Sequence, residues 1–157
     1  CFMRKDRAVY EKMYELIRPV VKDKTVLEVA TGTGLIAKHI VKAAAHIEAT
    51  DASVEMIAEA KRDNQSAKLH FSVQDMFRLP YADKSFDVVI VSNALHIVPQ
   101  PEKALAEIHR VLKDDGVLIA PTFTHAGNSF SGKVSGRARN ICASCGKTAG
   151  RCGKALF

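Results

Sequence analysis

Short apolar runs alternate with amphipathic runs along most of this chain, and that alternation limits the folds it can adopt. Apolar runs of strand length lie at residues 25–30, 46–51, 68–73, 86–92 and 116–123. Runs with apolar residues at a helical period lie at residues 4–21, where we expect the helix to end near Pro19, and at 35–45, 53–63 and 101–113. Strands that alternate with helices favour a parallel sheet covered by helices on both faces. We therefore predict an α/β fold with a doubly wound, mostly parallel sheet.

The stretch VLEVATGTGLIAKHI, residues 26–40, carries the strongest functional signal. An apolar run that contains the acid Glu28 meets two glycines, Gly32 and Gly34, and an amphipathic run follows. In a doubly wound sheet, ligands bind beyond the carboxyl ends of the strands, where this turn would lie. Glycines permit a positive φ and close approach of the backbone, and amides at a helix start favour a polar or anionic group. We predict a ligand-binding turn here.

Two cofactors fit this turn. The spacing of Gly32, Gly34 and Ala37 fits the dinucleotide fingerprint G-x-G-x-x-A, and Asp51 would then hold a ribose. A nicotinamide enzyme usually needs a second half or a substrate domain, for which 157 residues leave no room. Pyrophosphate binding also does not call for an acid inside the first strand. A further acid, Asp75, ends the third apolar run, so the acids together suit a nucleoside that carries an amino acid.

Residues 24–124 resemble the class I S-adenosylmethionine-dependent methyltransferases. VLEVATGTG is similar to their first motif, and IEATDAS is similar to their ribose-binding second strand. Residues 72–119, SVQDMFRLPYADKSFDVVIVSNALHIVPQPEKALAEIHRVLKDDGVLI, resemble the rest of the core, in the branch that modifies small molecules such as the quinone-biosynthesis methyltransferases. The resemblance implies a Rossmann-like methyltransferase fold, S-adenosylmethionine as cofactor, and methyl transfer to a small-molecule acceptor.

The resemblance also implies which residues bind the methionine and ribose portions of the cofactor. Gly32 and Gly34 would pass close to the methionine portion, with Ala30 in the same turn. Glu28 would anchor that loop and help to receive the ammonium group. Asp51 would accept both ribose hydroxyls.

The adenine and the transferred methyl group would meet residues from the next strand ends. Ala52 would lie beside the adenine, Asp75 would accept its amino group, and Met76 would pack against the ring. Ser92 and Asn93, which leave the fourth predicted strand, would line the methyl-transfer pocket.

One candidate for a catalytic group lies just after the fourth predicted strand. His96 has the position and the near-neutral pKa class of a general base. A phenol or alcohol acceptor needs such a base, whereas a thiol, amine or stabilised carbanion needs little help. The predicted N-terminal helix, with Tyr10 and Tyr14, would form part of a lid.

The alternating pattern ends near residue 126. We therefore predict a cofactor-binding domain at residues 1–126 and a basic tail, rich in glycine and serine, at residues 127–157. The family normally ends in an antiparallel pair of strands, which the tail does not show. The net charge of +6 comes from six basic residues within 133–157, where Asp and Glu are absent, so residues 1–132 are formally neutral. A neutral core does not favour a nucleic-acid partner.

The tail also holds Cys142, Cys145 and Cys152, a C-x2-C pair with one more thiol. The alternatives are a zinc site, a redox pair and adventitious thiols, and the lack of a fourth ligand in the tail favours the last. We predict no metal. Apolar runs here fall short of the ~20 residues of a membrane helix, and the charged N-terminus does not resemble a signal peptide, so we predict a cytoplasmic protein without a membrane partner.

Two other functions stay open on the sequence alone. One is a nicotinamide-dependent oxidoreductase, which differs in the cofactor it binds. The other is a catalytically silent, methyltransferase-like binding module that docks through the basic tail. The sequence does not indicate the oligomeric state.

Overall fold

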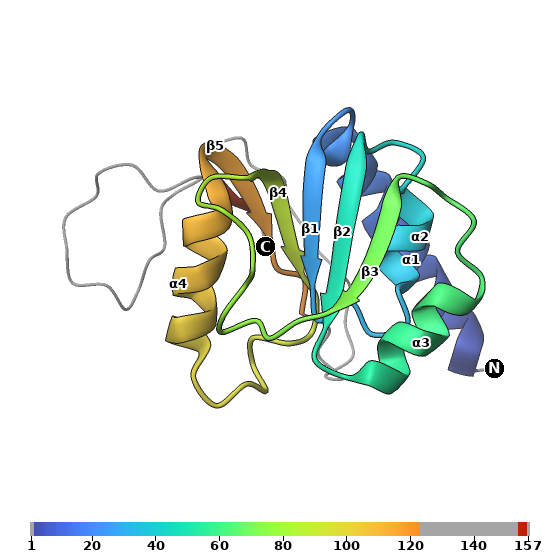
Figure 1. Ribbon diagram of the computed structural model, residues 1–157. Helices are drawn as coiled ribbons and strands as arrows, with labels where there is room; N and C mark the ends of the chain where they lie inside the picture. Colours follow the sequence, from blue (N-terminus) through green and yellow to red (C-terminus); the bar gives the residue numbers. More distant parts are fainter. Residues whose placement is uncertain (1, 123–153, 157) are drawn as a thin grey trace.

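The computed structural model describes the backbone of residues 2–122 and 154–156 and the side chains of residues 7–122. Helices and strands alternate as the sequence predicts (Figure 1). In chain order they are α1 (Phe2–Val21), β1 (Thr25–Val29), α2 (Leu35–Ile40), β2 (His46–Asp51), α3 (Val54–Arg62), β3 (Leu69–Val73), β4 (Phe86–Val91), α4 (Pro101–Val111), β5 (Leu112–Ile119) and β6 (Lys154–Leu156).

The strands form one sheet in the order β3-β2-β1-β4-β5-β6, and each strand runs parallel to its neighbours. From β1 the chain moves outward through β2 to β3, then returns to place β4 on the other side of β1. Val29 of β1 pairs with Thr50 of β2 and with Val91 of β4. The order therefore reverses between β1 and β4, which confirms the predicted doubly wound α/β fold and puts the switch point at their carboxyl ends.

Helices cover both faces of the sheet, and each face has its own apolar core. In Figure 1, α1, α2 and α3 lie together on one side, and α4 lies on the other. Val26 of β1 faces the first group, whereas Leu27 and Val29 face α4. β4 alternates in the same way, with Val88 and Ile90 in one core and Val89 and Val91 in the other. Burial on both faces explains why β4 is an uninterrupted apolar run.

One predicted helix end is wrong by more than a turn. α2 ends at Ile40 rather than near residue 45. The following backbone bonds elsewhere: the Ala43 carbonyl accepts from Asp23 N at 2.9 Å, and Ala45 N donates to the Lys24 carbonyl at 3.0 Å. α1 ends at Val21, close to the expected end near Pro19, and the Val21 side chain is fully buried in the core.

The start of the fifth strand also differs from prediction. β5 begins at Leu112, and its register against β4 shifts between the pairs Phe86–Leu112 and Val88–Val117. Residues 113–116, between these two pairs, form this irregularity within the strand. β6 pairs in parallel with residues 117–119 of β5. The predicted domain boundary at residue 126 and the three tail cysteines lie outside the described residues.

Candidate functional site

The turn after β1 has the backbone geometry that its glycines permit. Gly32 and Gly34 have φ of +58° and +77°, and Ala30 also has a positive φ, +55°. A Cβ on Gly34 would lie 2.5 Å from Cζ of Phe71, whereas one on Gly32 would meet nothing within 4 Å. Gly34 is thus required by both conformation and packing. The Gly32 side of the turn is open to a ligand.

Glu28 lies beneath this turn and holds it to α2. Its side chain is 2% exposed, and Oε2 accepts a hydrogen bond from Ala37 N at 3.0 Å. Burial raises the pKa of Glu28 to about 7, although that bond and the nearby Thr31 hydroxyl oppose the shift, and Asp51 adds a smaller raising effect. The Thr31 hydroxyl makes no hydrogen bond of ordinary geometry within the described residues. The acid inside β1 therefore supports the loop from within the fold.

Asp51 joins the ends of β1 and β2. Oδ2 accepts from Gly32 N at 2.8 Å, and Oδ1 accepts from Ser53 N at 2.9 Å. A carboxylate has about four acceptor positions, so each oxygen keeps capacity for a ligand hydroxyl. Ser53 caps α3, with its Oγ accepting from Met56 N at 3.2 Å. Ala52, between them, is exposed.

Asp75 lies in a turn just after β3. It is exposed, and its Oδ1 accepts from Phe77 N at 2.9 Å. Gln74 N donates to the Asp51 carbonyl at 3.0 Å, which fixes the start of this turn against the end of β2. Met76 is half-buried and packs against the core on the α4 side.

The residues after β4 complete this edge of the sheet. Asn93 has a φ of +52°, and its amide donates to the Pro121 carbonyl at 3.0 Å. Ser92 is half-buried, and His96 is exposed in the turn that follows. Asn93 and Ala30 are non-glycine residues in the left-handed region, just beyond the paired strands β4 and β1.

Sheet order brings most of the predicted site residues to one edge, since the carboxyl ends of parallel strands meet there. Direct hydrogen bonds link the β1 turn to Asp51 and Asp51 to the β3 turn. Phe71, which supports Gly34, was missed by the sequence reasoning. Phe71 lies two residues after Leu69 on β3, and this spacing predicts that both side chains face the core. It does not predict the contact with Gly34.

Tyr14 does not belong to a lid. It is 2% exposed, lies in the core, and stacks on the His39 ring of α2 with centroids 4.3 Å apart. Burial, with nearby Tyr10 adding to it, raises the pKa of Tyr14 to about 12. The side chain therefore secures α1 against α2.

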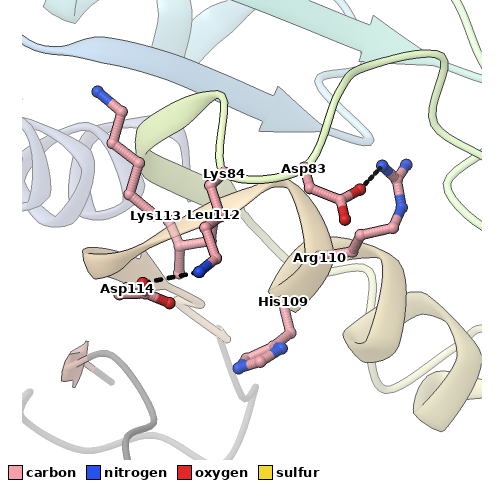
Figure 2. Close-up of a pocket in the computed structure, with 7 residues that line it drawn as sticks. All are labelled: Asp83, Lys84, His109, Arg110, Leu112, Lys113 and Asp114. Carbon is pink, nitrogen blue, oxygen red and sulfur yellow. Dashed lines mark hydrogen bonds and ion pairs between the residues drawn. The ribbon is translucent and has the colours of Figure 1, made fainter.

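A cavity of about 290 Å³ lies elsewhere, at the C-terminal end of α4 and the start of β5 (Figure 2). Four of its charged side chains pair with one another: Lys84 Nζ lies 2.7 Å from Asp114 Oδ2, and Arg110 Nη1 lies 2.9 Å from Asp83 Oδ1. We interpret this cavity as a surface recess lined by ion pairs. The convergent polar groups that a ligand site needs lie at the carboxyl ends of the strands instead. No metal-binding cluster of His, Cys, Asp or Glu occurs among the described residues.

Comparison with known proteins agrees with this geometry. Residues 27–120 match the family described as methyltransferase domain. The demethylmenaquinone methyltransferase of Renibacterium salmoninarum is 39% identical over 105 residues, which cover 67% of this chain and 44% of that protein.

Two solved structures share the fold. A chain in the complex between the Haloferax volcanii Trm112 methyltransferase activator and the putative methyltransferase has a TM-score of 0.62 and 30% identity, covering 68% of this chain and 47% of its own. The [4+2]-cyclase SpnF has a TM-score of 0.62 and 29% identity, with 68% and 42% covered.

This chain spans less than half the length of each of these three proteins. The family match still covers more than half of the chain, and it favours S-adenosylmethionine over a nicotinamide cofactor. The chain belongs to the class I S-adenosylmethionine-dependent methyltransferase family.

Proposed function

We propose that this chain forms the cofactor-binding part of an enzyme that transfers a methyl group from S-adenosylmethionine to a small molecule. A quinone-type acceptor is the class suggested by the 39% identical demethylmenaquinone methyltransferase. The observation that carries the proposal is the pair of hydrogen bonds made by the Asp51 carboxylate. One oxygen accepts from Gly32 N in the turn after β1, and the other accepts from Ser53 N just after β2. A carboxylate fixed in this way is suited to a pair of vicinal hydroxyls.

The residues present fit each portion of the cofactor. Gly32, with open space where a side chain would be, allows the methionine portion to approach the backbone. Asp51 binds the ribose, and Asp75, exposed at the end of β3, accepts from the adenine amine. Glu28 acts from beneath: it orders the turn and contributes negative potential toward the ammonium when ionised.

The chain catalyses the reaction mainly by positioning. When bound, S-adenosylmethionine supplies an activated methyl group on a sulfonium whose leaving form is a neutral thioether. The ordered turns hold that group while Ser92 and Asn93 line the approach to it. Fixing reactants in line can supply on the order of 7–11 kcal/mol. His96 takes a proton when the acceptor is a phenol or an alcohol.

The experiment is calorimetric titration with S-adenosylhomocysteine, with NADH as the comparison ligand. We expect micromolar binding of S-adenosylhomocysteine alone. Asp51→Ala should weaken it at least roughly tenfold, because hydrogen bonds to charged groups are worth more than neutral ones. Asp114→Asn, an exposed acid at the other edge of the sheet, serves as the control and should bind normally. Binding of NADH alone would overturn the proposal.

The alternative hypothesis, a silent binding module, predicts a different second result. Such a chain would bind S-adenosylhomocysteine yet form no methylated product across a panel of quinol, phenol, thiol and amine acceptors. The residues described contain no helix long and apolar enough to cross a membrane. A cytoplasmic location stays a prediction from the sequence.

A further inference from the structure

Two side chains of α4 hold the loop of residues 74–85, which joins β3 to β4. Arg110 Nη2 donates to the Leu79 carbonyl at 2.9 Å, and Nη1 donates to the Tyr81 carbonyl at 2.7 Å. Glu107 Oε2 accepts from Leu79 N at 2.9 Å. Leu79 thus has both its backbone polar groups bound by the same pair of side chains, while its own side chain is buried in the core.

Glu107 and Arg110 also fix one another. Arg110 Nε and Nη2 lie 2.9 Å from the two Glu107 carboxylate oxygens, a bidentate arrangement. Asp83, at the far end of the loop, accepts from Nη1 of Arg110 at 2.9 Å (Figure 2). The Arg110 hydrogen bond is the largest cause that lowers the pKa of Glu107, so both groups stay charged at neutral pH. A planar guanidinium held on several sides is a rigid support for a loop.

The loop segment next to this support carries the proposed adenine contacts. Asp75 and Met76 lie in a short turn in which Arg78 N donates to the Asp75 carbonyl at 3.0 Å. The turn is anchored at its start by the bond from Gln74 N to the Asp51 carbonyl. It is anchored at its end by Leu79. Movement of Leu79 would therefore move the Asp75 carboxylate relative to Asp51.

We propose that Glu107 and Arg110 are positioning residues for the adenine end of the cofactor site. They act through Leu79 and the turn that carries Asp75, and they lie on a helix away from the site itself. This inference rests on the proposed function, because it assigns Asp75 to the adenine amine. The inference gives the two acids different supports. The position of Asp51 is fixed by residues at the ends of β1 and β2, whereas the position of Asp75 depends on side chains of α4.

The test uses two variants. Arg110→Lys keeps the positive charge but loses the planar guanidinium that makes several hydrogen bonds at once, and Glu107→Gln keeps the shape of the side chain but loses its charge. Each variant is titrated with S-adenosylhomocysteine and with its inosine counterpart, S-inosylhomocysteine, which lacks the exocyclic amine. The unaltered chain should prefer the adenosine ligand by roughly tenfold, the value of a charge-assisted hydrogen bond. Both variants should bring this ratio close to one, and Asp75→Ala should do the same. A smaller folded fraction weakens both ligands equally and leaves the ratio unchanged.

Hydrogen exchange of the ligand-free chain provides a readout that needs no cofactor. The amides of Phe77 and Leu79 should exchange faster in both variants than in the unaltered chain. Asp114→Asn, which alters an acid lining the same cavity as Arg110, serves as the control. It should change neither the exchange of these amides nor the ratio of the two ligand affinities. Unchanged ratios together with unchanged exchange in the variants overturn the inference, as does equal binding of the two ligands by the unaltered chain. Binding of neither ligand by that chain refutes the proposed function instead. Faster exchange would then still support loop anchoring.

Discussion

The buried acid Glu28 makes the stability of this domain depend on pH in an unusual direction. Burial raises the pKa of Glu28 from its ordinary 4.5 to about 7 in the folded chain. In the unfolded chain the group titrates near its ordinary value. Between these two pH values the folded state holds a proton that the unfolded state has lost. The contribution of Glu28 to stability is therefore most favourable below pH 4.5, falls as the pH rises, and levels off above pH 7.

The magnitude follows from the two pKa values. A tenfold difference in proton affinity between the folded and unfolded chain corresponds to about 1.4 kcal/mol. The change in stability between pH 5 and pH 8 therefore integrates to about 2.5 kcal/mol for a folded-state pKa of about 7. Other titrating groups also change the stability over this range. The useful quantity is therefore the difference in the free energy of unfolding between Glu28→Gln, which cannot titrate, and the unaltered chain.

The assay is urea unfolding of both proteins at pH 5, 6, 7 and 8. Relative to the unaltered chain, Glu28→Gln should become more stable by about 2.5 kcal/mol from the lowest pH to the highest. Any constant cost of altering the bond to Ala37 N cancels in this comparison. A difference that does not vary with pH, or that varies in the opposite direction, would refute a buried Glu28 with a raised pKa.

Four further substitutions test the candidate site. Gly34→Ala should lower the free energy of unfolding in urea by about 2–5 kcal/mol, because the new side chain is strained in a left-handed conformation and clashes with the Phe71 ring. Gly32→Ala carries only the conformational strain, since its Cβ would meet nothing within 4 Å, and should lower it by about 1–2 kcal/mol. Equal costs would contradict the packing argument. Asp51→Asn should keep the fold by circular dichroism and weaken S-adenosylhomocysteine at least roughly tenfold by calorimetry, because an amide donor would face a backbone donor. His96→Ala should leave that affinity intact and slow methylation of a phenol acceptor roughly a hundredfold. Unchanged turnover would remove its role as a base.

The sheet was predictable because hydrophobic pattern and burial agree in its strands. The sequence of β4 is an almost uninterrupted apolar run because its side chains pack alternately into the two cores. β1 shows the same pattern except at Glu28. Helix ends were less predictable, since they depend on partners distant in sequence. α2 stops at Ile40 because the backbone after it bonds to residues 23 and 24, before β1. A local period carries no information on such bonds.

The geometry of the candidate site was predictable where residue type itself has a geometric consequence. Gly32 and Gly34 adopt the positive φ that their positions suggest, and Asp51 ends a strand beside them. The supports beneath the site were not predictable. The contact of Phe71 with Gly34, like the hold of Arg110 on the β3–β4 loop, arises only when separate elements pack together.

The most direct test of the central claim is to map where the cofactor binds, by amide chemical shifts of the labelled chain during addition of S-adenosylhomocysteine. The account predicts that the largest changes fall on the amides of Gly32, Gly34, Ser53 and Phe77, which lie at the carboxyl ends of β1, β2 and β3. Saturable changes confined to the cavity of Figure 2, at the other edge of the sheet, would contradict it.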